Sequence, residues 1–140
     1  MKLSAKTEYA CLAMLQLAHD YSTGEPVQIR RIADVHGIPS RFLVQILLQL
    51  KGASLVASTR GAAGGYRLAR PPREITLGEV IEVMEGDERP HTNAGKMTPL
   101  VNALLYLCRE LGNAQHDRLD DLSLADIVEQ AAQREPMWYI

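Results

Sequence analysis

Apolar side chains recur at helical spacing along the first 50 residues and predict three helices. The first helix covers residues 3–19, and the sequence Gly24-Glu25-Pro26 ends this region. Its apolar face is formed by Leu3, Ala10, Met14 and Leu17. A short second helix contains Ile29, Ile32 and Ala33 and stops at His36-Gly37.

The third helix begins at Ile38-Pro39-Ser40 and places apolar residues at positions i, i+3, i+4 and i+7. These residues are Leu43, Ile46, Leu47 and Leu50. The opposite face is formed by Ser40, Arg41, Val44, Gln45 and Gln49. Two helices joined by a short glycine turn, the second with a polar outward face at its start, are typical of a helix–turn–helix.

A glycine-rich loop follows the third helix and is flanked by two short predicted strands, residues 55–59 and 66–69. Its sequence is Arg60-Gly61-Ala62-Ala63-Gly64-Gly65-Tyr66-Arg67-Leu68. Glycines let the backbone approach a flat surface closely, and the arginines can reach phosphates or a narrow groove. An amphipathic helix followed by a basic, glycine-tipped hairpin has the layout of a winged helix–turn–helix. The alternative is an ordinary hairpin turn on a small domain.

The second half of the chain is predicted to contain three further helices. Arg70-Pro71-Pro72-Arg73 interrupts the pattern, and Thr76 and Glu79 then form a capping box for a helix over residues 77–85. Residues 86–96 are polar and loop-like, and residues 97–111 form a long helix. A last helix covers residues 124–133, with Ser123 as its cap. The predicted fold is mainly α with a small β-wing.

The long helix carries a near-heptad apolar stripe that is too wide to be buried against one small domain. The stripe consists of Met97, Leu100, Val101, Leu104, Leu105, Cys108 and Leu111.

Composition places the chain among cytoplasmic proteins of one domain, or one domain with an appendage. Of its 140 residues 46% are hydrophobic but only 5% are aromatic, so the core is aliphatic. No run approaches the roughly 20 apolar residues of a membrane span, and the start lacks the apolar region of a signal peptide. Two cysteines are too few for a secreted disulfide framework.

Charge is distributed unevenly along the chain. Residues 1–73 contain ten Lys and Arg against four Asp and Glu, a net charge of +6, and the remainder has a net charge of −8. This asymmetry indicates a basic half that faces a polyanion and an acidic half that faces elsewhere. Chance segregation on a solvated surface is the alternative.

Several runs of this sequence resemble the Rrf-type winged-helix transcription regulators, the IscR/NsrR/CymR-like family. In the helix–turn–helix they are Ile32-Ala33-Asp34, Ile38-Pro39, Phe42-Leu43, Gln45-Ile46-Leu47 and Leu50-Lys51. The resemblance also covers the wing with its continuation to Pro71 and the run from Glu74 to Ile81. At the start of the chain it covers Met1-Lys2-Leu3-Ser4 and Thr7-Glu8-Tyr9-Ala10. The chain departs from the family at Ser54, where a glycine is usual.

The resemblance implies a symmetric homodimer on double-stranded DNA. Residues 1–86 would form the DNA-binding domain, and residues 87–140 the loop, the dimerisation helix and the C-terminal helix. The apolar stripe on residues 97–111 would be the dimer interface. The third helix would enter the major groove and the wing the adjacent minor groove. The residues expected at the DNA are Ser40, Arg41, Gln45, Arg60, Gly64, Gly65, Tyr66 and Arg67.

These residues are expected to act differently. Arg41 and Gln45 can bond to base edges while Ser40 meets phosphate, and Arg60 probes the minor groove. Gly64 and Gly65 are conformational requirements of the wing. We expect the Tyr66 ring to pack on a helix rather than to contact phosphate, and Arg30 and Arg31 to form a solvated face.

Many relatives sense iron, nitric oxide or redox state through an iron–sulfur cluster held by three cysteines in the loop that corresponds to residues 86–96. That loop contains no cysteine here. We therefore expect no cofactor and no metal, with Cys11 and Cys108 as buried, inert thiols. The alternative is a redox sensor with unusual ligands drawn from Glu8, His36, His91 and Cys108.

The sequence thus predicts a dimeric, sequence-specific transcriptional regulator, a repressor acting on an inverted-repeat operator. Its signal would be a regulatory protein or a small molecule. No nucleophile–base pair, phosphate loop or metal-ligand spacing indicates an enzyme. A protein–protein adaptor built on the winged-helix fold is the remaining alternative, and the basic residues Arg41, Arg60 and Arg67 argue against it.

Overall fold

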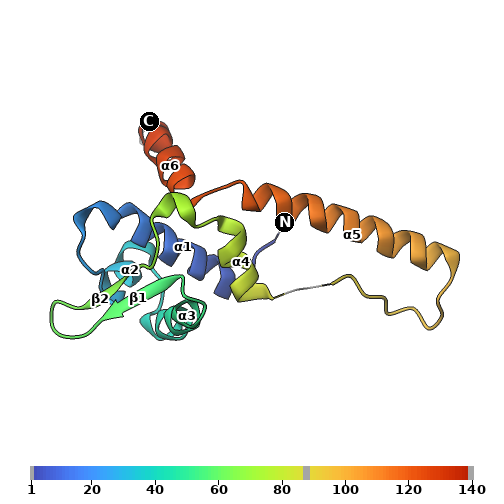
Figure 1. The fold of residues 1–140 in the computed structure, drawn as a ribbon, viewed down its shortest axis with the longest axis horizontal. Helices are drawn as coiled ribbons and strands as arrows, with labels where there is room; N and C mark the ends of the chain where they lie inside the picture. Colours follow the sequence, from blue (N-terminus) through green and yellow to red (C-terminus); the bar gives the residue numbers. More distant parts are fainter. Residues whose placement is uncertain (1, 87–88, 139–140) are drawn as a thin grey trace.

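The computed structural model describes residues 2–86 and 89–138 and contains helices with one two-stranded sheet (Figure 1). The helices are α1 (Ala5–His19), α2 (Ile29–His36), α3 (Ser40–Gly52), α4 (Leu77–Glu85), α5 (Pro99–Asp120) and α6 (Leu124–Trp138). The strands are β1 (Val56–Thr59) and β2 (Gly65–Leu68), and short 3-10 turns cover Tyr21–Thr23 and Pro72–Glu74. The mainly helical fold with a β-wing is confirmed.

Helix α1 forms the centre of the core. It begins two residues later than predicted because Ser4 caps it: the Ser4 Oγ accepts a hydrogen bond from the Thr7 amide at 3.2 Å. Ala10 and Met14 on α1 have no solvent exposure, and Leu17 has almost none. Helices α3, α4 and α6 all pack against α1, so the aliphatic core joins the two halves of the sequence.

The helix–turn–helix has the predicted bounds. Gly37 ends α2 in the left-handed region at φ 66°, and α3 starts at Ser40. The apolar face of α3 faces the core, where Leu43, Ile46, Leu47 and Leu50 are at most 2% exposed. The packing of that face leaves the opposite side of α3 directed to solvent.

The end of α3 explains the departure at Ser54. The Leu55 amide donates to the Leu50 carbonyl at 3.0 Å and the Ser54 amide to the Lys51 carbonyl at 2.9 Å, the bond pattern of a Schellman motif. That motif needs a left-handed residue, and Ser54 adopts φ 62°. Among the described residues it is the one non-glycine with positive φ.

The wing is an antiparallel hairpin in which Val56 pairs with Leu68 and Thr59 with Gly65. β1 starts one residue later than predicted, and β2 is shifted by one residue toward the N-terminus at both ends. Val27 adds a third backbone pairing, because its amide donates to the Tyr66 carbonyl at 2.7 Å and its carbonyl accepts from the Tyr66 amide at 2.8 Å. The segment before α2 therefore holds the base of the wing.

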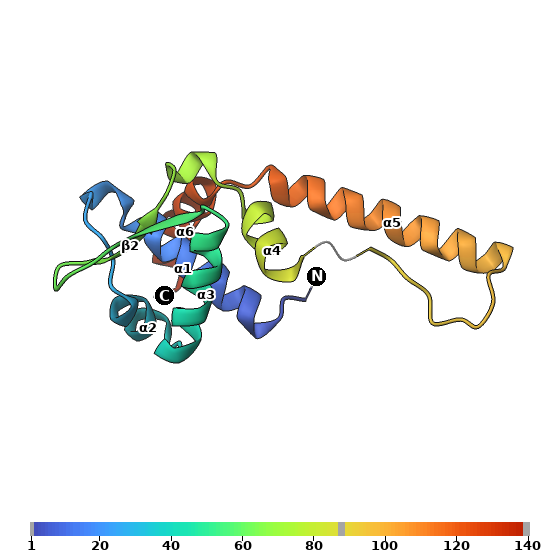
Figure 2. The ribbon, with the colours of Figure 1, turned by 60° about the horizontal axis from the view of Figure 1, so that its bottom comes forward.

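Helix α4 has the predicted bounds and the predicted capping box between Thr76 and Glu79. Helix α5 differs from the prediction: it starts at Pro99, with Thr98 as its cap, rather than at Met97, and it continues to Asp120 rather than to Leu111. Residues 112–120 are mostly polar, with Leu119 as their one large apolar side chain, so they do not continue the apolar stripe on which the prediction depended. Figure 2 shows α5 extending away from the other helices as a long arm.

Helix α6 returns to the core. The Leu124 amide donates to the Ile75 carbonyl at 2.9 Å, the Leu77 amide donates to the Leu122 carbonyl at 2.8 Å, and Leu124 is fully buried. Ser123 caps α6 as predicted, since its Oγ accepts from the Asp126 amide at 3.0 Å. The helix continues five residues beyond the predicted end at 133. Within the described residues, no helix combines the length and the apolar character that crossing a membrane requires.

Candidate nucleic-acid interface

The outward face of α3 has the composition that the sequence predicted. Ser40, Arg41, Val44, Gln45 and Gln49 are all exposed. Gln49 is drawn toward α4, because its side-chain amide donates to the Val83 carbonyl at 3.0 Å. The side chains at the start of the helix remain directed to solvent and available for a ligand.

Arg41 is placed by aromatic neighbours. Its guanidinium carbon lies 4.9 Å from the centre of the Phe42 ring, and that ring stacks on Tyr9 of α1 with 6.1 Å between the ring centres. A cation above an aromatic face is attracted by the ring's quadrupole. The Arg41 guanidinium is thus held at the start of α3 while it stays exposed.

A buried carboxylate fixes α2 against α1. Asp20 accepts hydrogen bonds from the Arg31 Nε at 2.7 Å and Nη2 at 3.1 Å, and from the Gln16 Nε2 at 3.1 Å. The bonded Arg31 guanidinium holds the pKa of the Asp20 carboxyl well below its ordinary value. Arg31 stays exposed as expected, with 51% of its side chain open to solvent, but it is also paired with Asp20, which the sequence did not predict. Arg30 is exposed as well, and its Nε lies 3.8 Å from the Asp34 Oδ2.

The same network reaches the end of α2. The Gln16 Oε1 lies 2.9 Å from the His36 Nε2, and burial lowers the pKa of His36. Gln16 and Asp20 have the i, i+4 spacing of neighbours on one helix, but no sequence pattern links that pair to Arg31 or His36 of α2. Its effect is to fix the angle at which α2, and α3 after it, leave the core.

The wing extends beside α2 and α3, at the opposite end of the molecule from the α5 arm (Figures 1 and 2). Arg60 and Arg67 are exposed on it. Gln28 supports the tip, because its Nε2 donates to the Ala62 carbonyl at 3.0 Å. The structure therefore brings the exposed arginines of the wing and the outward face of α3 to one end of the chain.

Two glycines are required by close backbone approach. A Cβ at Gly64 would collide with the Thr59 carbonyl oxygen, and a Cβ at Gly65, which has φ 154°, would collide with the Val27 carbonyl oxygen. Both roles agree with the expectation that these glycines shape the wing. Tyr66 is partly buried against the core, as expected for a strand residue that packs inward.

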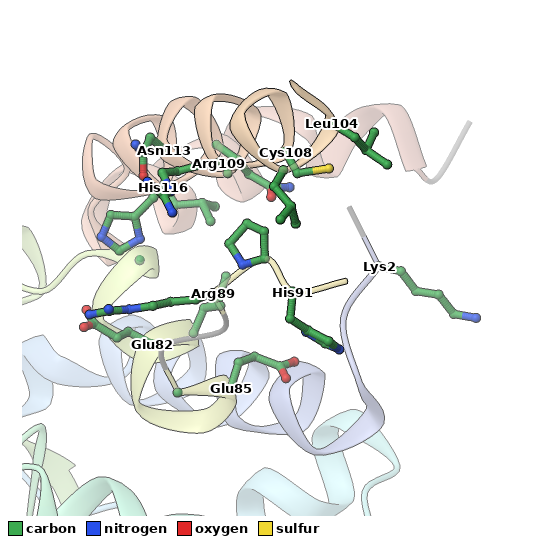
Figure 3. A pocket seen from close by; sticks show the side chains of 18 of the residues that line it. Lys2, Glu82, Glu85, Arg89, His91, Leu104, Cys108, Arg109, Asn113 and His116 are labelled. Atoms are coloured by element: carbon green, nitrogen blue, oxygen red, sulfur yellow. The ribbon is translucent and has the colours of Figure 1, made fainter. Parts of the chain in front are cut away.

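A second feature is the groove of about 1430 Å³ between α4, α5 and the segment that joins them. Leu104 and Cys108 of α5 lie opposite Glu82 and Glu85 of α4 (Figure 3). The α4 wall is fixed to α1, since Glu85 accepts from the Thr7 hydroxyl at 2.7 Å, a bond that lowers the pKa of Glu85.

The predicted interface stripe is uncovered in the single chain. None of the residues of α5 is buried, and the exposed fractions reach 83% at Leu100 and 72% at Leu111. Val101 and Leu105 are half-buried. The expectation that Cys108 is buried is wrong for the single chain, where its thiol is exposed. A helical stripe does not reveal whether its own chain or another covers it.

The two cysteines differ in chemistry. Cys11 is buried in α1, and this burial, with the carboxylates of Glu8 and Glu85, raises the pKa of its thiol to about 11. Among residues 2–86 and 89–138, no group of three or more His, Cys, Asp and Glu side chains comes together as a metal site. The ligands considered for an unusual redox sensor, Glu8, His36, His91 and Cys108, are therefore not brought together as a metal site in this part of the chain. His36 is instead hydrogen-bonded to Gln16.

A family model described as Rrf2, iron-dependent transcriptional regulator, matches residues 3–130. The chain belongs to the Rrf2 family of transcriptional regulators. This family consists of regulators that bind DNA and not of enzymes.

Two Rrf2 relatives illustrate the similarity. A helix–turn–helix transcriptional regulator of Mycobacterium tuberculosis is 37% identical over 131 residues, which cover 91% of this chain and 81% of that protein. The regulator CymR of Bacillus subtilis is 33% identical over 142 residues, covering both proteins completely. The solved structure of CymR, described as the global cysteine regulator of B. subtilis, has a TM-score of 0.80 at 32% identity and covers 93% of this chain and 98% of that one.

The iron in the family's description requires ligands. The family resemblance of the sequence implied a cluster held by three cysteines of the loop that corresponds to residues 86–96, and those residues contain no cysteine. The two cysteines of the chain lie on α1 and on α5. This donor set does not fit a cluster held by three thiolates of that segment.

Proposed function

We propose that this Rrf2 regulator is a homodimeric, sequence-specific repressor that acts in the cytoplasm on an inverted-repeat operator. One observation carries the proposal: α3 presents Arg41 and Gln45 on an exposed face, and the wing beside it presents Arg60 and Arg67. Both elements belong to the half of the chain with a net charge of +6, which suits a polyanion.

The residues of this surface have distinct proposed roles. Arg41 and Gln45 bond to base edges in the major groove, and Ser40 contacts phosphate. Arg60 enters the minor groove, where the potential depends on groove width, and Arg67 contacts the backbone. Gly64, Gly65 and Tyr66 act indirectly by shaping the wing that presents these arginines.

Residues 1–86 form the DNA-binding part in this proposal, and residues 87–140 contribute the loop, the dimer helix and α6. The dimer forms through the stripe from Met97 to Leu111. The exposure of the stripe supports it, since Leu100 is 83% and Leu104 62% exposed in the single chain and both can pack against a partner. Two α3 helices related by a two-fold axis then meet major grooves about 34 Å apart.

The signal in this proposal is a regulatory protein or a small molecule and not an iron–sulfur cluster. The support is the donor set of this chain, which lacks the three loop thiolates. Cys11 also has a pKa near 11, which leaves it protonated and unreactive at neutral pH.

Selection of bound duplexes from a random pool, followed by affinity measurement, tests the proposal. We expect Arg41→Ala to weaken the selected duplex by about 10- to 100-fold, because a bidentate base contact contributes roughly 1–3 kcal/mol. Arg134→Ala removes the same charge from α6 and should change affinity less than about twofold. If Arg41→Ala and Arg134→Ala lost the same affinity, Arg41 would contribute only nonspecific charge. If no sequence were enriched from the pool, the protein–protein adaptor would be favoured.

A further inference from the structure

The outward face of α3 carries an apolar patch among its polar groups. Arg41, Gln45 and Leu48 occupy positions i, i+4 and i+7 and share one side of the helix. Leu48 is 52% exposed, and Val44, one turn earlier, is 41% exposed. Neither side chain belongs to the core, which α3 fills with Leu43, Ile46, Leu47 and Leu50 from its inner face.

We propose that Leu48, which shares this apolar patch with Val44, contacts the C5-methyl group of one thymine per half-site in the major groove and makes that thymine part of the sequence that α3 reads. This inference rests on the proposed function. The thymine methyl is the apolar group that a base pair presents in the major groove, and an apolar side chain contacts it without hydrogen bonds. A leucine side chain cannot bind a phosphate group, because phosphate oxygens are contacted by charged side chains and hydrogen-bond donors.

The surroundings of the patch favour DNA over a protein as its occupant. Leu48 shares its side of α3 with Arg41 and Gln45, which can donate to the acceptors of base edges. The half of the chain that contains α3 has a net charge of +6, complementary to a duplex. Double-stranded DNA is a polyanion with thymine methyl groups in its major groove, so it complements both the positive charge of this half of the chain and the apolar patch of Val44 and Leu48.

The spacing on α3 also predicts where the thymine lies. Arg41 and Leu48 are seven residues apart, which at 1.5 Å per residue is about 10 Å along the helix axis. Base pairs follow one another at about 3.4 Å. With the helix axis along the groove, the thymine is about three base pairs from the base that Arg41 contacts.

Replacement of single thymines by deoxyuridine in a selected duplex tests the inference, because only the methyl group is lost. For the unchanged protein we expect one position per half-site to lose about fourfold in affinity, the value of one buried methyl-sized group. Leu48→Ala should bind both duplexes equally. Leu48→Met, which keeps an apolar side chain of similar size, should retain the thymine preference. Val35→Ala, which shortens a side chain that is 53% exposed on α2, should also retain it.

The outcomes separate the inference from the function on which it rests. A sequence-specific complex in which no deoxyuridine substitution matters would overturn the role of Leu48 and leave DNA binding intact. A deoxyuridine effect that persists in Leu48→Ala would assign the methyl contact to another side chain. If no duplex is selected at all, the proposed function fails as well, and a protein occupant of the patch becomes the better account.

Discussion

Replacing Ser54 by glycine should stabilise the protein, because the structure holds this residue at φ 62°. An L-residue in the left-handed region costs roughly 1–2 kcal/mol. Glycine avoids that cost but loses more backbone entropy on folding, roughly 0.5–1 kcal/mol. The difference leaves a gain of about 0.5–1 kcal/mol. At about 2.1 cal/mol/K per residue, a chain of 140 residues has an unfolding entropy of about 0.3 kcal/mol/K, so Tm should rise by about 2–3 °C.

Thermal unfolding followed by circular dichroism measures this shift, at one fixed protein concentration because the proposed dimerisation would make Tm concentration-dependent. Ser54→Ala is the matched control: it removes the hydroxyl but keeps the Cβ, so it should give no such gain. If Ser54→Gly left Tm unchanged or lowered it, or if Ser54→Ala gave the same rise, the Schellman turn at the end of α3 would not carry the strain assigned to it.

Three further predictions concern the apolar stripe of α5, the thiols and the buried carboxylate. Leu104→Glu places a charge in the apolar stripe and should shift the protein to its 15.5 kDa monomer in sedimentation; a mutant that stays dimeric would place the interface elsewhere. Iodoacetamide should alkylate Cys108 faster than Cys11 in the native protein, and more slowly as concentration favours the dimer; equal rates would refute the burial difference. Because Arg31 lowers the pKa of Asp20, the ionised carboxylate stabilises the fold above about pH 4, and this contribution is lost as the pH falls further. In urea unfolding, Asp20→Asn should therefore lose less stability than wild type between pH 7 and pH 3. An identical loss in both proteins would contradict the network.

The sequence predicted those elements whose signals are local. The turn at Gly37, the start of α3 at Ser40 and the capping box at Thr76 each depend on residues within one or two helical turns, so α2, α3 and α4 have the expected bounds. The exposed face of α3 followed from the same periodicity, because its apolar residues define the opposite side. Those patterns were sufficient to locate the candidate DNA surface.

Contacts between distant residues were not predictable from such patterns. The bonds of Asp20 join α1 to α2, and the buried Leu124 returns α6 to the core from the far end of the sequence. The polar second half of α5 has no apolar period, so its helix was not expected to reach Asp120. Exposure of Cys108 depends on whether a second chain covers the stripe, which no pattern within one chain decides.

If α3 and the wing together recognise one DNA sequence, a salt series on a selected duplex and a scrambled one separates that recognition from nonspecific binding to DNA. The account predicts that the selected duplex binds at least about 10³-fold more tightly near physiological salt. It also predicts that the logarithm of both affinities falls linearly with the logarithm of salt concentration, because lysines and arginines release counterions. Equal affinity for the two duplexes, or affinity that does not change with salt, would contradict the account.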